Sequence, residues 1–254
     1  MVDLFGLTGK VAVVAGGAGG IGRALALGMA ECGADVMIAD LQLEHFEEMA
    51  DKIRALGRQA LAVTMDVTQE QSVADMVKRT LEVFSHIDIL VNAAGITARK
   101  PADSLPVDEW QKVMDVNIRG TFLTCQAVGR VMIKQASGKI INISSVRGRY
   151  GVPSGGAAYC ASKGAVDTLT RTLACEWAKY NVLVNAIAPT IVETDFTRST
   201  LANPESAQGI KARIPVGRWG QPEDLIGPVV FLASKASDFV TGQIVYIDGG
   251  VTTW

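Results

Sequence analysis

The chain has few of the residues that build metal centres or disulfide frameworks. Its 254 residues include four cysteines and two histidines, and the cysteines are neither clustered nor set at the spacing of metal ligands. Reduced structural thiols and no metal are therefore expected. An excess of charge of one sign is lacking as well, because 24 basic and 26 acidic residues are spread along the chain. Without a basic stripe, nucleic acid is not an expected partner.

Long apolar runs are also missing. No stretch approaches the roughly 18 apolar residues of a transmembrane helix, and the first residues lack the basic and apolar regions of a signal peptide. A cytoplasmic protein with no membrane partner is expected. No repeat, low-complexity tract or Pro/Ser-rich linker divides the sequence, and 48% hydrophobic residues suffice for a full core. Residues 1–254 are therefore predicted to form a single domain.

What the sequence does contain is an alternation of short β-rich runs with longer helical patterns. The predicted strands are 11–15, 36–39, 60–65, 87–91, 139–143, 183–187 and 244–247. Several are apolar on both faces, which is typical of strands buried in a parallel sheet between helices. The predicted fold class is α/β, a doubly wound Rossmann domain with a seven-stranded, mostly parallel sheet.

Three further segments carry expectations about helices and loops. A helix is expected after each of the first six strands, the longest being 106–135 and 157–180. Polar and small residues at 189–213 interrupt the alternation. Long loops in compact domains are often lids or binding loops, and they also fold into short helices. This segment is the predicted substrate loop.

A glycine-rich segment, AGGAGGIG at 15–22, follows the first predicted strand and precedes a helix expected to begin near Arg23. Gly16, Gly20 and Gly22 allow close approach of a pyrophosphate, whose charge is favoured by free amides and the dipole at a helix N-terminus. By itself, the motif is as compatible with an ordinary strand-to-helix turn of an α/β protein.

Asp40 supplies the missing context. It ends the second predicted strand, where a dinucleotide fold places the acid that accepts hydrogen bonds from the adenosine ribose. A carboxylate there repels a 2′-phosphate, and Gly19 and Leu41 stand where a cation for NADP would be sought, leaving Arg23 nearby. NAD is the predicted cofactor, although an Asp at a strand end can also cap the next helix.

Tyr159 and Lys163 are four residues apart, so on a helix they share one face. A free phenol has a pKa of about 10, and a fixed positive charge beside it favours the phenolate. Tyr159 with Lys163 beside it could therefore act as a general base. In isolation, a Tyr and a Lys at this spacing are more often an amphipathic surface pair.

With its surroundings, the YCASK segment at 159–163 resembles the short-chain dehydrogenase/reductase family, and the likeness extends from GKV at 9–11 to DGG at 248–250. The resemblance implies that Tyr159 is the base, that Lys163 lowers its pKa and holds the ribose, and that Ser145 positions the substrate oxygen. Ser144 is a supporting residue or a strand-end cap. Asn117 is expected to hold water in a proton relay, the alternative being a buried Asn that satisfies its helix.

The resemblance also implies a set of residues that contact the cofactor. They are Gly16, Gly20, Ile21, Gly22, Asp40, Leu41, Asp66, Val67, Asn92, Ala94, Gly95, Tyr159, Lys163, Pro189, Val192 and Thr194. Asp66 could instead cap a helix, and Pro189 could simply end a strand. Ala15, Ala93 and Thr190 depart from the family pattern and affect the expected fine geometry, not the reaction class.

The stretch 213–234 is similar to sugar-acid members of the family, gluconate 5-dehydrogenase and 2-dehydro-3-deoxygluconate 5-dehydrogenase. The expected reaction moves a hydride between nicotinamide and a secondary alcohol or ketone of a sugar acid, polyol or other small anionic hydroxy compound. Arg99, Arg147, Arg149 and Arg198 stand on segments expected at the mouth, where a guanidinium pairs well with a carboxylate, although surface arginines are usually only solvated.

Two rival functions are weighed against this prediction. A 3-oxoacyl-thioester reductase would normally use NADPH, which Asp40 disfavours, and a non-catalytic nicotinamide-sensing protein would not need the complete Ser, Tyr, Lys and Asn set. The helices at 106–135 and 157–180 resemble those through which family members form homodimers and homotetramers. The sequence leaves open whether Trp254 closes a neighbour's pocket.

Overall fold

A computed structural model describes residues 3–43, 46–153 and 155–253, so Trp254 lies outside the described residues. Its centre is a seven-stranded sheet in the order β3-β2-β1-β4-β5-β6-β7, and every neighbouring pair is parallel. The strands are β1 (Val11–Ala15), β2 (Asp35–Asp40), β3 (Ala60–Thr64), β4 (Ile89–Asn92), β5 (Gly138–Ile143), β6 (Val182–Pro189) and β7 (Ile244–Ile247). The predicted fold class is confirmed, and all seven strands lie where the apolar runs indicated them.

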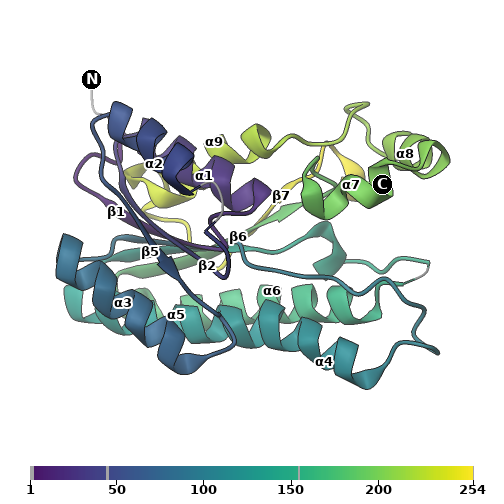
Figure 1. The fold of residues 1–254 in the computed structure, drawn as a ribbon, viewed down its shortest axis with the longest axis horizontal. Coiled ribbons are helices and arrows are strands. Elements are labelled where there is room, and N and C mark those ends of the chain that lie inside the picture. Colours follow the sequence, from purple (N-terminus) through teal and green to yellow (C-terminus); the bar gives the residue numbers. More distant parts are fainter. Residues whose placement is uncertain (1–2, 44–45, 154, 254) are drawn as a thin grey trace.

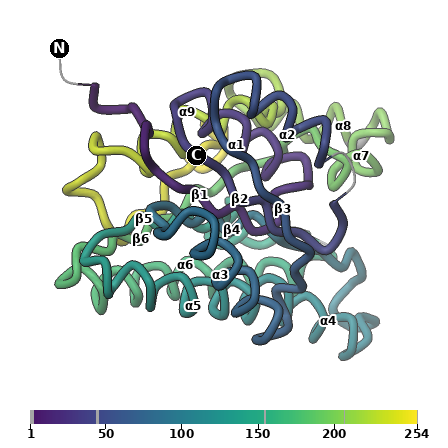
Figure 2. The backbone as a smooth tube through the Cα atoms, turned by 60° about the vertical axis from the view of Figure 1, so that its left-hand side comes forward, coloured from purple at the N-terminus to yellow at the C-terminus, as the bar shows by residue number. Residues whose placement is uncertain are grey.

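Helices cover both faces of the sheet. Figure 1 shows α1, α2 and α9 on one side and α3, α5 and α6 on the other, and Figure 2 shows the same separation after rotation. The helices are α1 (Gly20–Glu31), α2 (Phe46–Ala55), α3 (Glu70–Phe84), α4 (Val107–Met114), α5 (Gly120–Gln135), α6 (Ala157–Trp177), α7 (Asp195–Leu201), α8 (Pro204–Lys211) and α9 (Ile226–Ala233).

The alternation along β1 explains why its sequence is continuously apolar. Ala12 and Val14 pack into the core beneath α1 and α9, whereas Val11 and Val13 pack into the core against α3, α5 and α6. Successive side chains of a strand point to opposite faces, so a strand with helices on both sides needs apolar residues at every position.

Two helices differ from their predicted extent. The first helix begins at Gly20, not near Arg23, so the last glycines of the motif already belong to α1. The long helix expected at 106–135 is divided into α4 and α5 by a π-helical turn, Asp115–Arg119. The predicted substrate loop contains α7 and α8, which Figure 1 shows together at one end of the molecule.

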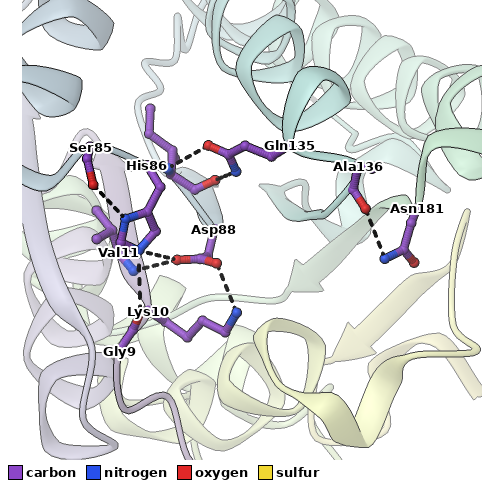
Figure 3. A network of polar contacts seen from close by, with 10 residues as sticks. Gly9, Lys10, Val11, Ser85, His86, Asp88, Gln135, Ala136 and Asn181 are labelled. Atoms are coloured by element: carbon purple, nitrogen blue, oxygen red, sulfur yellow. Dashed lines mark hydrogen bonds and ion pairs between the residues drawn. The ribbon is translucent and has the colours of Figure 1, made fainter.

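Asp88 joins the amino ends of β1 and β4 (Figure 3). Its carboxylate accepts hydrogen bonds from the Val11 amide and the Lys10 ammonium, both at 2.9 Å, and lies 3.1 Å from Nε2 of His86. Gln135, at the end of α5, bonds both backbone groups of Ile87 at 3.1 and 2.8 Å. These contacts fix the edge of the sheet opposite to the candidate site.

Candidate active site

The turn between β1 and α1 brings backbone close to backbone, which only glycine permits. Gly16 has a φ of +80°, and a Cβ there would lie 2.4 Å from the Ala94 amide nitrogen. A Cβ on Gly22 would lie 2.1 Å from the Gly16 carbonyl oxygen, and one on Gly20 would lie 2.7 Å from Cγ2 of Thr194. The turn therefore presents bare backbone, and no side chain caps the start of α1.

This turn forms one wall of a cavity of about 360 Å³ at the carboxyl edge of the sheet. The fold brings together there many of the residues predicted from the sequence: Gly16, Gly20, Ile21, Gly22, Gly95, Ser145, Tyr159, Lys163, Pro189, Val192 and Thr194. A cavity at this edge, with exposed amides at a helix N-terminus, fits the pyrophosphate of a nicotinamide dinucleotide.

Asp40 lies at the end of β2, next to the glycine turn. Its Oδ2 accepts a hydrogen bond of 3.0 Å from the Ala18 amide, so this carboxylate fixes the shape of the turn. Oδ1 accepts no hydrogen bond from the described residues. Leu41, which follows Asp40, is exposed.

Other predicted cofactor residues have local partners of their own. Asp66 accepts two hydrogen bonds of 2.8 Å from Thr68 in the turn before α3, but the N-cap residue of α3 is Gln69, so Asp66 does not cap that helix. Val67 packs against Gly120, where an added Cβ would lie 2.7 Å from Cγ2 of Val67. Asn92 is buried and donates to Asn142 at 2.9 Å, between β4 and β5. Thr194 is the N-cap residue of α7.

Tyr159 and Lys163 lie on the first turns of α6. The Lys163 ammonium is buried, donates a 2.7 Å hydrogen bond to the carbonyl of Ile143 and lies 5.7 Å from the centre of the Tyr159 ring. Burial lowers the pKa of Lys163 to about 8, and the negative charge of Asp167 opposes that effect. The ammonium is therefore held beside the phenol and close to losing its proton under mildly alkaline conditions.

The phenol of Tyr159 differs from the expectation in one respect. Burial raises its pKa, and the groups that act in the opposite direction are the hydroxyl of Ser145 and the guanidinium groups of Arg147 and Arg99. Lys163 is not one of the groups that lower the pKa of this phenol. Desolvation outweighs the attraction of nearby cations, so the phenol alone holds its proton more tightly than a free tyrosine.

Ser145 is at the end of β5, where its hydroxyl accepts a 3.1 Å hydrogen bond from the Arg147 amide and donates to the Pro189 carbonyl at 3.4 Å. Ser144 points elsewhere: its hydroxyl donates to Asp167 on α6 at 2.5 Å. Asp167 was missed in the sequence reasoning. Its signal was present, because it follows Lys163 by four residues and so shares a helix face with it.

Asn117 is buried within the π-helical turn. Its side chain donates to the Ile96 carbonyl at 2.9 Å and to the Ser162 hydroxyl at 3.0 Å, and it accepts from the Ile96 amide at 2.8 Å. A Cβ on Gly95 would lie 3.5 Å from Oδ1 of Asn117 and 3.7 Å from Nζ of Lys163. Asn117 and Lys163 therefore flank the same glycine, and the turn brings them to one place.

A second cavity, of about 460 Å³, adjoins the first and shares Ser145 and Tyr159 with it. Arg99 and Arg147 line it together with uncharged residues, and no Asp or Glu is among the described residues of its wall. On α7, Phe196 places its ring 6.2 Å from that of Tyr159. The predicted substrate loop thus lies over the candidate catalytic tyrosine.

The four arginines predicted at the mouth are not equivalent. Arg99 donates to the hydroxyls of Ser199 and Thr200 and to the Phe196 carbonyl, so it ties the loop after β4 to α7. Arg149 lies over the Tyr246 ring at 5.5 Å, outside the catalytic cavity. Arg198 pairs with Asp195 and faces a separate groove along α1 and α2. Only Arg99 and Arg147 of these four line the catalytic cavity.

Known proteins match the chain over nearly its whole length. A family model described as enoyl-(acyl carrier protein) reductase matches residues 16–252. The 2-dehydro-3-deoxy-D-gluconate 5-dehydrogenase of Dickeya dadantii is 43% identical, with 98% of each chain covered. The NAD-dependent glycerol dehydrogenase of Listeria innocua is 39% identical, with 98% of this chain and 96% of the relative covered.

A solved structure agrees with these sequence matches. The gluconate 5-dehydrogenase of Burkholderia cenocepacia, in complex with NADP and tartrate, has a TM-score of 0.95 at 40% identity and covers 99% of this chain and 98% of its own. The chain belongs to the short-chain dehydrogenase/reductase family, as the residues around Tyr159 indicated. It is an oxidoreductase of the kind that acts on a CH–OH group.

Proposed function

We propose that the protein is an NAD-dependent dehydrogenase of a sugar acid or a similar small anionic polyol. One observation carries this proposal: Ser145 and Tyr159 share their cavity with Arg99 and Arg147, and no carboxylate lines its described wall. A guanidinium in a partly enclosed site favours an anionic substrate over a neutral one. The names of the sugar-acid relatives support the same substrate class.

The residues have separate tasks in the proposed oxidation. Ser145 donates a hydrogen bond to the reacting oxygen, and Tyr159 takes the proton of the hydroxyl group. Lys163, held by the Ile143 carbonyl, provides positive charge beside the phenol and holds the ribose. Asn117 positions the backbone at Ile96 and leads the proton path toward solvent. A bound nicotinamide dinucleotide supplies the hydride acceptor, or the donor in reduction.

Asp40 carries the proposed preference for NAD. A carboxylate that is already fixed by the Ala18 amide repels a 2′-phosphate and accepts hydrogen bonds from the free hydroxyls of NAD. Arg23, which also lines the cofactor cavity, is the cation nearest in sequence that could favour NADP. We expect a higher kcat/KM with NAD. We also expect Asp40→Asn to shift the NAD/NADP ratio of kcat/KM toward NADP by about ten-fold or more.

The test is a panel of potential substrates assayed by reduction of NAD and of NADP. Gluconate and other aldonates, their 5-keto forms in reverse, neutral polyols such as glycerol, and a 3-oxoacyl thioester with NADPH distinguish the alternatives. We expect turnover of aldonates, reduced about ten-fold or more in kcat/KM by Arg147→Ala. Turnover of glycerol without any acid, or of the thioester alone, would contradict the proposal. Cofactor binding without turnover of any compound would instead favour a sensing protein.

A further inference from the structure

A third cavity, of about 740 Å³, opens beside the catalytic one and is lined by one arginine more. Arg147, Thr190 and Ile210 line both cavities, so the two adjoin. The additional wall comes from the loop after β5, from the turn after α8 and from residues 251–253. We call it the arginine cavity, because Arg147, Arg149 and Arg213 line it.

The three guanidinium groups have no acidic partner within the described residues. Arg147 donates to the Gly151 carbonyl at 3.2 Å, Arg149 lies over the Tyr246 ring, and Arg213 has no ion pair there. No Asp or Glu is among the described lining residues. Asp248, which acts electrostatically on Tyr150 in the wall, uses its two oxygens to accept the amides of Gly250 and Thr252 at 3.0 and 2.8 Å.

The segments that carry these arginines are anchored, although Arg149 and Arg213 are themselves exposed. Val146 and Ile214, each beside one of these arginine segments, are buried. A Cβ on Gly249 would lie 2.8 Å from Cγ2 of Ile214, and the Val216 amide donates to the Gly249 carbonyl at 3.1 Å. The chain after β7 therefore holds the turn that carries Arg213 in place.

Like charges that converge from remote segments repel one another unless an anion lies between them. Residues 147–149 and residue 213 are far apart in sequence, yet the fold brings them to one cavity next to Ser145. Planar guanidinium groups bind carboxylate and phosphate oxygens through two parallel hydrogen bonds, and the hydroxyls of Tyr150 and Thr252 add further donors. The cavity thus has the chemistry of an organic-acid or phosphate subsite.

We propose that the arginine cavity binds a second acid group of the substrate, a carboxylate or a phosphate, while the reacting carbinol lies at Ser145 and Tyr159. This inference rests on the proposed function and extends it, because it makes sugar diacids the preferred substrates. Arg99 lines the catalytic cavity but not the arginine cavity, so it is the residue that would bind the first acid group. Aldarates and phosphorylated aldonates have this chemistry, and simple aldonates lack it.

The experiment compares kcat/KM for gluconate, glucarate and 6-phosphogluconate in the wild type and in Arg213→Ala, Arg149→Ala and Arg213→Lys. We expect at least one diacid to exceed gluconate by about ten-fold or more. We expect each alanine variant to lower that diacid-to-monoacid ratio by about ten-fold, and the lysine variant to lower it less. Arg79→Ala, an exposed arginine on α3 paired with Glu82, is the matched control and leaves the ratio unchanged.

Competition by inorganic phosphate distinguishes an acid group of the substrate from a free anion as the occupant of the arginine cavity. If phosphate competes with substrate but no diacid is preferred, the cavity takes a free anion and the assignment to the substrate is wrong. An equal loss for monoacid and diacid in the variants overturns the proposal as well. Arg149 contacts the Tyr246 ring, so Arg149→Ala could fail to fold. In that case the Arg213 variants carry the test, provided that their melting temperature equals that of the wild type. Turnover of neutral polyols alone would overturn the proposed function instead.

Discussion

The hydroxyl of Ser144 donates a 2.5 Å hydrogen bond to the carboxylate of Asp167, and both side chains are buried. Ser144 immediately precedes Ser145, and Asp167 follows Lys163 by one helical turn. This buried contact joins the end of β5, next to the proposed oxygen-binding hydroxyl, to α6, which carries the phenol and the ammonium, and the bond from Lys163 to the Ile143 carbonyl is a second link between them. Asp167 also opposes the burial that lowers the pKa of Lys163.

Asp167→Asn should change the pH dependence of the reaction. Its amide can still accept the Ser144 hydrogen bond, but the negative charge is gone, so the pKa of Lys163 falls further below about 8. The ammonium is then lost at lower pH, and the alkaline decline of kcat/KM moves to lower pH. We expect kcat/KM to fall by about ten-fold near pH 8. Glu176→Gln, an exposed acid on the same helix, is the control; an unmoved alkaline limb in Asp167→Asn would leave Asp167 a purely structural residue.

Tyr159→Phe should abolish turnover and preserve the fold. The ring still packs beside Phe196, but no group remains to take the hydroxyl proton, so we expect kcat to fall by roughly 10³-fold. Titration with NAD and NADH, followed by fluorescence, should give dissociation constants close to those of the wild type. Tyr180→Phe, in the 3₁₀ turn that follows α6, serves as the control. Substantial activity in Tyr159→Phe would rule out the proposed base.

Lys163→Met should reveal the burial of the ammonium as a pH-dependent stability difference. In the unfolded chain the pKa of lysine is about 10.4, whereas in the folded protein it is about 8, so between these values the unfolded state binds more protons. The free energy of unfolding of the wild type therefore increases relative to that of the variant as pH rises through that window, by up to about 3 kcal/mol. Urea unfolding of both proteins at pH 7 and pH 10 measures it. A pH-independent difference would contradict the burial argument.

Asp88→Ala should destabilise the protein without altering the site. The substitution leaves the Val11 amide and the Lys10 ammonium without their acceptor (Figure 3), which should lower the free energy of unfolding by about 1–3 kcal/mol. Because this edge of the sheet lies opposite to the catalytic cavity, kcat of the folded enzyme should stay unchanged. Asp51→Ala removes an exposed pair with Arg54 and should have little effect. Similar losses from both variants would contradict this account of the network.

The sheet and the site's framework could be predicted because their signals are local. Two-sided apolar strands, the glycine turn before α1 and the Tyr159–Lys163 spacing each follow from a few neighbouring residues. The roles assigned to Ser145, Tyr159, Lys163 and Asn117 stay predictions, as do the homodimer or homotetramer and the cytoplasmic location.

The arginines show where local signals end. Arg198 lies one position before Ser199, which contacts Arg99, yet the register of α7 turns Arg198 to the groove along α1 and α2. Sequence spacing could not give that register, because α7 was foreseen only as an alternative to a loop. Arg213 lines the same cavity as Arg147 although the two are far apart in sequence, and no local pattern records that proximity.

The π-helical turn at Asp115–Arg119 interrupts the regular α-helical repeat, and Asn117 lies within it. Such a turn holds one residue more than an α-helical turn, so deletion of a single residue there would restore the ordinary helical repeat from α4 into α5. The repaired helix would be the better helix in isolation. It would also rotate Asn117 relative to Ile96 or shift α5 against the sheet, so the irregular turn is a place where greater local order would bring a poorer enzyme.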